Sequence, residues 1–224
     1  MAVFMQNYIG LMSGTSLDAI DAVLVELDQH HCYQVRSVSH PIPPYLKQSL
    51  LDLTQPGNNE IEKLAVAEPA FAKECAKAVK QLLKQTQLTP LDITAIGSHG
   101  QTIRHRPEKG FTLQIGDPSL IAELTGITVV ADFRRRDVAA GGHGAPLVPA
   151  FHHSVFANAN EQRVIVNIGG MANITILGNE SVTGFDTGPG NILMDLWCHQ
   201  HLEQPFDKNG QWAASSDYHP DLFE

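Results

Sequence analysis

The chain has 224 residues, 43% of them hydrophobic, and its 15 basic and 24 acidic residues give a formal net charge of −9 at pH 7. This length suits one large domain or two modest ones with a buried core, and the acidic balance argues against broad binding to nucleic acid or to an anionic membrane. The three cysteines stand far apart without a CxxC pair, so we expect neither a disulfide framework nor a zinc ribbon, and a reducing cytoplasm fits best. We also expect no exporting or anchoring segment, because no signal-peptide pattern opens the chain and no apolar run approaches the roughly 18 residues of a membrane span.

The first predicted elements are strands followed by a long helix. Apolar runs separated by turn residues predict a meander of strands at 8–12, 20–26 and 33–40. Apolar residues at helical spacing then predict an amphipathic helix over 60–85, in which Pro69 is a candidate kink.

The following elements continue the alternation of strands and helices. Short strands are predicted at 93–98, 112–115 and 127–130. A helix is predicted at 118–125 with Asp117 as its N-cap, and the alternation indicates an α/β class. A polar segment at 158–162 precedes a second series of strand, turn and strand, so we expect a domain boundary near residue 160. The first domain would cover 1–160, and 161–224 would be the start of a second lobe that is not completed.

The loop at 13–16 follows the first predicted strand and is rich in small and hydroxyl residues. Backbone amides of such a loop can hold phosphate oxygens, and Gly14 lets the main chain approach them. The loop matches neither the Walker lysine pattern nor GxGxxG, and an ordinary hairpin turn is the alternative. Asp18 follows it, and a carboxylate beside phosphate suits Mg²⁺, held directly or through water; the alternative is that Asp18 only closes the turn.

Two further polar segments end predicted strands. The segment 97–102 combines glycines with neutral hydrogen-bonding side chains, which suits a sugar, although His99 has the alternative role of satisfying a backbone carbonyl. The segment 132–137 concentrates three arginines and leads into the glycine-rich stretch 141–144. These arginines indicate recognition of a carboxylate or phosphate, with a solvated charge run as the alternative.

The segment 184–191 places Asp186 in a glycine-rich turn directly ahead of a predicted helix. We expect this setting to bury the carboxylate and aim it into a cleft. Together with the phosphate-type loop at 13–16, it indicates phosphoryl transfer.

Five motifs, taken in order, closely resemble those of the anhydro-N-acetylmuramic acid kinase family: GLMSGTSLD at 10–18, GSHGQT at 97–102, ADFRRRD at 131–137, NIGGMAN at 167–173 and FDTGPGN at 185–191. The resemblance spans essentially the whole chain. It implies an α/β fold of two ribonuclease-H-like lobes, as in the sugar kinase, heat-shock ATPase and actin superfamily, with ATP and substrate between the lobes. Family members are longer, so we expect the second lobe to be incomplete and this chain alone to be short of what activity needs.

The resemblance implies a cytoplasmic kinase of cell-wall recycling that uses ATP and Mg²⁺. It would open the 1,6-anhydro bridge of 1,6-anhydro-N-acetylmuramic acid with water and phosphorylate O6, giving N-acetylmuramic acid 6-phosphate. Asp186 would activate the water, and His99, Gln101 and Arg135 would orient the sugar. The residues implied at the ATP phosphates and Mg²⁺ are Gly14, Thr15, Ser16, Leu17, Asp18, Ala19, Ile20, Asp21, Gly169 and Gly170.

Two other functions fit the same residues. One is an ordinary sugar or carboxylate kinase of the same superfamily, and the other is a non-catalytic module that binds sugar or ATP. The acid at Asp186 counts against the second. Nucleic acid and membranes are not expected as partners, and a homodimer is left open, because apolar surface at an incomplete lobe promotes association.

Overall fold

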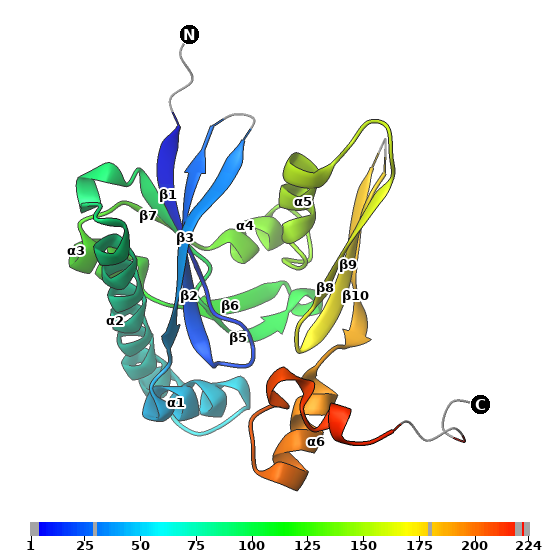
Figure 1. Ribbon diagram of the computed structural model, residues 1–224. Coiled ribbons are helices and arrows are strands. Elements are labelled where there is room, and N and C mark those ends of the chain that lie inside the picture. The colour runs from blue at the N-terminus through cyan, green and yellow to red at the C-terminus, as the bar shows by residue number, and fades with distance from the viewer. Residues whose placement is uncertain (1–4, 29–30, 179–180, 218–220, 222–224) are drawn as a thin grey trace. The chain divides into compact units, whose positions relative to one another are not determined.

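The computed structural model describes residues 5–28, 31–178, 181–217 and 221, and the chain forms two compact units, Met1–Leu147 and Val148–Glu224 (Figure 1). What the sequence predicts for residues 1–4, 218–220 and 222–224 lies outside the described residues. No helix within the described ranges is long and apolar enough to cross a membrane.

Unit 1 is built on a five-stranded mixed sheet. Across the sheet the strands are β3 Cys32–Pro41, β2 Ala19–Leu27, β1 Gln6–Met12, β4 Ala95–Ser98 and β7 Val129–Val130. The first three strands form the predicted antiparallel meander, and β4 and β7 run parallel to β1. A parallel neighbour requires a long crossover, which the helices between β3 and β4 supply. This strand order is that of a ribonuclease-H-like lobe and confirms the predicted α/β class.

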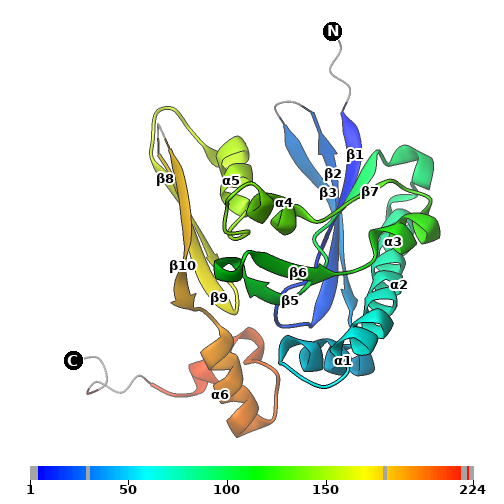
Figure 2. The ribbon, with the colours of Figure 1, turned by 180° about the vertical axis from the view of Figure 1, so that it is seen from behind.

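Three helices lie together on one side of this sheet: α1 Pro44–Thr54, α2 Glu60–Thr86 and α3 Pro118–Thr125 (Figures 1 and 2). The predicted long helix is confirmed, and α2 continues as one helix through Pro69. Its residues Phe71, Ala78 and Leu82 are buried against the sheet, as their helical spacing requires. Asp117 caps α3 by accepting from two backbone amides of the first turn.

Unit 1 contains elements that were not predicted. The helix α1 starts at Pro44 and buries Leu46, Leu50 and Leu53, a spacing typical of an amphipathic helix. The chain enters a strand already at Gln101, and the resulting hairpin pairs β5 Gln101–Arg106 with β6 Phe111–Ile115. The arginine segment forms the helix α4 Phe133–Ala139.

Unit 2 contains a three-stranded antiparallel sheet between two helices in the chain. Its elements are α5 Val148–Phe156, β8 Arg163–Ile168, β9 Met171–Leu177, β10 Val182–Pro189 and α6 Ile192–Leu202, and the strand order is β10-β9-β8. The helix α5 packs against β9 and β10, and His152 Nδ1 lies 2.9 Å from Thr175 Oγ1 of β9. The units therefore divide before α5, earlier than the boundary predicted near residue 160.

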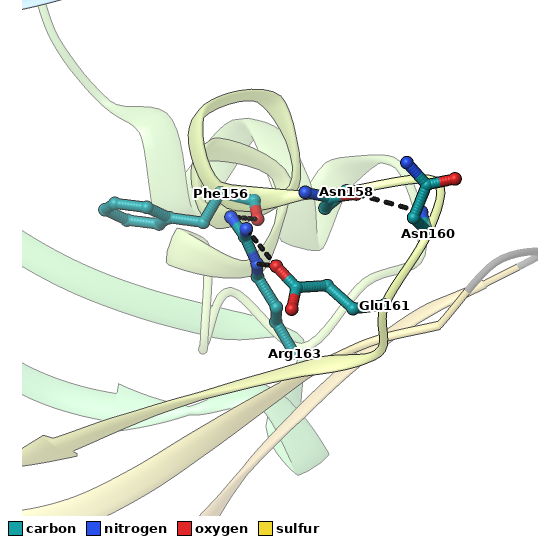
Figure 3. Close-up of polar contacts among 5 residues, drawn as sticks. All are labelled: Phe156, Asn158, Asn160, Glu161 and Arg163. Carbon is teal, nitrogen blue, oxygen red and sulfur yellow. Dashed lines mark hydrogen bonds and ion pairs between the residues drawn. The ribbon is translucent and has the colours of Figure 1, made fainter.

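The polar segment that suggested the later boundary is a tight turn between α5 and β8 (Figure 3). Arg163 donates from Nε to Glu161 Oε1 over 2.7 Å and from Nη1 to the carbonyl of Phe156 over 2.9 Å. The amide of Asn160 donates to Asn158 Oδ1 over 2.9 Å. These contacts hold the turn within unit 2, so the contact-based division falls before this polar segment and not at it.

Candidate functional site

The loop between β1 and β2 is a turn at one end of the sheet of unit 1. The amide of Leu17 donates to the carbonyl of Gly14 over 3.3 Å, and Leu17 has a φ of 55° and a buried side chain. Gly14, Thr15 and Ser16 are exposed. The turn thus has the exposed small residues that are typical of a phosphate loop. It is also the connection of two antiparallel neighbours, so its shape alone fits the hairpin alternative as well.

Two buried polar side chains lie beside this loop. Gln101 Nε2 donates to the carbonyl of Gly14 over 3.4 Å and to that of Thr102 over 3.2 Å. Gln101 Oε1 and Ser13 Oγ are buried and have no hydrogen-bond partner among the described residues. Buried polar atoms are nearly always paired, so these two oxygens mark places where a bound molecule or water would bond. Gln101, predicted to contact the sugar, is bonded to the phosphate-type loop.

Asp18 ends the loop with an exposed carboxylate. Its Oδ1 accepts a hydrogen bond of 2.8 Å from Nζ of Lys47, which lies on α1. The hydrogen bond from Lys47 lowers the pKa of Asp18; burial opposes this, and a hydrogen bond from Ser16 adds to it. The carboxylate is therefore ionised at neutral pH, which a Mg²⁺ ligand must be. Lys47 was missed because α1 was not predicted, although the leucines of α1 carried the signal.

The next three predicted phosphate-binding residues open the strand β2. Ile20 has its side chain in the core, so only its backbone is available to a ligand. Ala19 is half-buried, and Asp21 is exposed and lies opposite Met12 in the ladder with β1.

His99 follows β4 and is bound to its surroundings through both ring nitrogens. Its backbone amide donates to the carbonyl of Leu11 over 3.1 Å, which fixes it beside the end of β1. Nδ1 lies 2.7 Å from the carbonyl oxygen of Gly100, and Nε2 accepts from Arg134 Nε over 2.8 Å. Burial lowers the pKa of His99; the Gly100 carbonyl raises it and the charge of Arg134 lowers it further. His99 therefore has the alternative role as well, because its Nδ1 satisfies the carbonyl of Gly100.

His99 also lines a polar cavity of about 170 Å³, with backbone and side chains from β4, β6, α2 and α4. Arg135, the predicted sugar-binding arginine, lines it and donates to Asp132 Oδ2 over 3.2 Å. Two residues that sequence reasoning did not select, Glu68 and Gln114, line it as well, and Gln114 Oε1 is buried without a hydrogen-bond partner in the described part of the chain. A larger cavity of about 550 Å³ along α2 contains none of the predicted site residues.

In unit 2 the two glycine-rich segments meet. The amide of Gly190 donates to the carbonyl of Gly170, and that of Asn191 to the carbonyl of Gly169, both over 2.8 Å. A Cβ on Gly190 would lie 2.2 Å from the carbonyl oxygen of Gly169, so this approach requires glycine. The predicted residues Gly169 and Gly170 thus lie beside the turn that leads from β10 to α6.

Asp186 is on β10, opposite Asn173 and directly before a bulge that ends at Gly188. Its side chain is exposed in unit 2, which corrects the expectation of a carboxylate buried in a turn, because the segment through Pro189 forms an extended strand that does not enclose the acid. Among the described residues nothing donates to or pairs with this carboxylate, so it does not bond the amides of its own turn. It is available to a ligand.

Unit 1 thus brings together the loop at 13–18, His99, Gln101 and Arg135, whereas in unit 2 Gly169 and Gly170 contact the turn after β10, and Asp186 lies further along β10 opposite Asn173. The loops after the parallel neighbours β1 and β4 emerge at the same edge of the sheet, where open α/β sheets bind ligands. The chemistry available is anion binding by amides and arginine in unit 1 and proton abstraction by a carboxylate in unit 2.

Comparison of the sequence with known proteins adds three findings. The sequence model of a family described as anhydro-N-acetylmuramic acid kinase matches residues 6–224. The anhydro-N-acetylmuramic acid kinase of Acinetobacter baylyi is 53% identical over 210 residues, 92% of this chain and 55% of that protein. That of Shewanella frigidimarina is 55% identical over 223 residues, 98% of this chain and 60% of that protein.

The chain therefore spans little more than half the length of the curated relatives it matches. Among solved structures, a Ppx/GppA family member of Aquifex aeolicus matches 86% of this chain and 54% of its own, with 7% identity and a TM-score of 0.39.

Proposed function

The chain belongs to the anhydro-N-acetylmuramic acid kinase family, and we propose that it forms the N-terminal part of a kinase that opens and phosphorylates 1,6-anhydro-N-acetylmuramic acid. In this reaction water attacks the anomeric carbon C1, and the C1–O6 bond of the anhydro bridge breaks. The released O6 forms a bond to the γ-phosphorus of ATP as the bond to the β,γ-bridging oxygen breaks. The products are N-acetylmuramic acid 6-phosphate and ADP, as peptidoglycan recycling requires.

The observation that carries this proposal is the state of Asp186. Its carboxylate is exposed and accepts no hydrogen bond within the described part of the chain, so no structural contact there uses it. A free carboxylate can take the proton of the attacking water, and a positioned base of this kind contributes about 10²–10⁴-fold to the rate. The close approach of Gly190 to Gly169 stabilises the turn that follows β10, the strand that carries Asp186.

The loop after β1 supports the phosphate side of the reaction. Gly14, Thr15 and Ser16 offer exposed backbone to phosphate oxygens, and the buried Ser13 Oγ is unpaired among the described residues. Asp18 fits Mg²⁺, because magnesium in phosphate sites takes one or two protein carboxylates with the phosphates and water. Bound Mg²⁺ would neutralise phosphate charge, and Lys47 would then share Asp18 with it.

The cavity beside His99 supports the sugar side. Arg135 is a forked donor suited to a carboxylate such as that of the lactyl group, and it is paired with Asp132, the N-cap of α4, one turn earlier. Glu68 and the unpaired Gln114 Oε1 add acceptors for sugar hydroxyl or amide donors. His99 Nε2 is engaged by Arg134, so His99 would contact the sugar through its ring edge and backbone.

ATP is a cytoplasmic metabolite, so the proposed reaction is cytoplasmic. A homodimer is part of the same proposal, because the exposed apolar residues of α6 favour association: Leu193, Met194, Leu196 and Trp197.

The test is a product mass spectrum from the complete reading frame that contains these residues, incubated with ATP, Mg²⁺ and the 1,6-anhydro sugar beside this 224-residue chain. We expect a gain of one phosphoryl group and one water. A gain of the phosphoryl group alone would identify an ordinary sugar kinase and remove the water-activating role from Asp186.

The second arm is Asp186→Asn, which we expect to lower turnover about 10²–10⁴-fold. Asp195→Asn is the matched control, because Asp195 lies in the first turn of α6 and is not part of the proposed site. Full activity of Asp186→Asn would refute the base assignment.

A further inference from the structure

Arg134 determines the protonation state of His99. The Nε of an arginine carries a hydrogen and can only donate, so His99 Nε2, 2.8 Å away, must present its lone pair. The single ring hydrogen is then on Nδ1, which lies 2.7 Å from the carbonyl oxygen of Gly100 and donates to it. His99 is therefore held as the neutral Nδ1–H tautomer by one donor and one acceptor.

The same guanidinium reaches the glycine-rich stretch 141–144, which the proposed function leaves without a role. Arg134 Nη1 donates to the carbonyl of Gly144 over 2.6 Å, and the amide of Gly144 donates to Asp137 Oδ2 over 2.7 Å. Gly144 is buried with a φ of 73°, and a Cβ there would lie 3.1 Å from Val138 Cγ2. The loop is thus tied to α4 at both its amide and its carbonyl.

We propose that Arg134 is a positioning residue: its guanidinium clasps His99 and Gly144 together, so that the wall of the polar cavity and the 141–144 loop are held in one arrangement, and protonation of His99 releases the clasp. The step is a proton transfer from solvent to His99 Nε2, which removes the lone pair that accepts from Arg134. The role of the cavity as the sugar site rests on the proposed function, whereas the clasp itself does not.

The charged and titratable groups around His99 favour its neutral form. On α4, the positive charge of Arg134 lowers the pKa of His99. Arg135, also on α4, lines the same cavity but is paired with Asp132. From α2, Glu68 lines the cavity and accepts from the amide of Gly116 over 3.3 Å. From β5, His105 lies near Gly144, and burial and the charge of Arg134 lower its pKa too. No carboxylate among these is bonded to the His99 ring, so Arg134 is the charge that acts on it directly.

The experiment is nitrogen-15 NMR of the histidine rings of the 224-residue chain, with His99 assigned by the loss of its signals in His99→Gln. In the wild type we expect one tautomer, with hydrogen on Nδ1. Arg134→Gln should give a mixture of tautomers and a ring that protonates at higher pH. Arg136→Gln is the matched control, because Arg136 is an exposed arginine on the same helix, and it should leave His99 as in the wild type.

Amide hydrogen exchange at Gly144 is the second readout, measured in the wild type against pH and then in His99→Gln. We expect the protection factor of the Gly144 amide, which compares its exchange rate with the intrinsic rate at the same pH, to fall about tenfold, equivalent to about 1.4 kcal/mol, as His99 is protonated. In His99→Gln, whose side-chain oxygen can accept from Arg134 without titrating, this pH dependence should disappear. A wild-type ring with hydrogen on Nε2, or a tautomer and titration unchanged by Arg134→Gln, would overturn the clasp. If protection of the Gly144 amide does not change when His99 is protonated, the proposed release of the clasp by acid is wrong.

In the complete enzyme, Arg134→Gln should raise KM for the sugar more than it lowers kcat, because it disturbs the cavity without touching the reacting atoms. Absence of any kinase activity would refute the proposed function and leave the NMR result standing. If Arg134→Gln gives a mixture of His99 tautomers but leaves KM for the sugar unchanged, the contact of Arg134 with His99 does not contribute to substrate binding.

Discussion

Gly100 lies between β4 and β5 and meets two separate conditions that only glycine satisfies. Its φ is +74°, and a Cβ built on it would lie 2.7 Å from the carbonyl oxygen of Ile115 and 3.3 Å from Gln114 Cβ. Its own carbonyl accepts from His99 Nδ1. Gly100→Ala therefore tests whether the end of β6 approaches this turn as closely as described. Gly110→Ala is the matched control, because Gly110 has a φ of +76° and nothing within 4 Å of its Cβ position.

The two substitutions share one energy term and differ in another. A left-handed conformation costs an alanine about 1–2 kcal/mol relative to glycine, and the reduced freedom of the unfolded chain returns about 0.4–1 kcal/mol. These terms apply at both positions, so Gly110→Ala should cost about 0–1.6 kcal/mol. At Gly100 the Cβ meets backbone, which cannot rotate away, and overpacking of this kind adds about 1–3 kcal/mol.

The assay is thermal unfolding of both variants, followed by far-ultraviolet circular dichroism at one protein concentration. For a chain of this size each kcal/mol shifts Tm by about 2–4 °C, so Gly100→Ala should melt about 2–12 °C below Gly110→Ala. Equal melting temperatures for the two variants would refute the close approach of Gly100 to Ile115. A Gly110→Ala variant that melts well below the wild type would show that the shared backbone term is larger than assumed.

Two further predictions concern buried groups of unit 1. Burial alone would raise the pKa of Glu74, whose side chain is 4% exposed, but hydrogen bonds from Lys77 and His40 lower it below its usual value. His40→Ala should therefore lower the free energy of unfolding, measured by urea denaturation, by about 1.5–3 kcal/mol. Lys77→Ala removes an exposed partner and should lower it by about 0–1 kcal/mol. Equal losses in the two variants would contradict this difference. Because the pKa values of His99 and His105 are lowered by folding, the unfolded chain binds more protons below about pH 6.5, so stability should fall from about pH 7 to pH 5. His99→Gln should flatten that slope, and a wild-type stability that does not change over this range would argue against two half-buried histidines that folding keeps neutral.

The strands and the long helix could be predicted because their burial follows a simple period. In α2 the buried Phe71, Cys75 and Leu82 repeat at helical spacing, and in β2 the buried Ile20, Ala22 and Leu24 alternate with less buried neighbours. The helix α1 carried a comparable signal in its leucines behind Pro44 and was missed. The missing element mattered for the site, because α1 supplies the lysine that pairs with Asp18.

The division of the chain into two units differs from the boundary that composition predicts. Polar residues at 158–162 are typical of a linker, but a polar turn inside a unit has the same composition when its side chains bond one another, as Arg163 and Glu161 do. What assigns α5 to unit 2 is packing on β9, including the contact between His152 and Thr175. Packing partners far apart in the sequence are not visible in a local pattern.

The choice among the three arginines depends on the same kind of information. In a strand, side chains at 134 and 136 would share a face, whereas in a helix successive side chains point about 100° apart. The segment is the helix α4, so Arg134 contacts His99 and Gly144, while Arg135 pairs with Asp132 one turn earlier and lines the cavity. That this cluster recognises an anion stays a prediction of the sequence, whereas the bond of Arg134 to His99 and the place of Arg135 in the cavity followed only from the helix and its orientation. If the two arginines differ in this way, Arg134→Gln and Arg135→Gln should separate in the NMR experiment, with the tautomer of His99 changed by the first and not by the second.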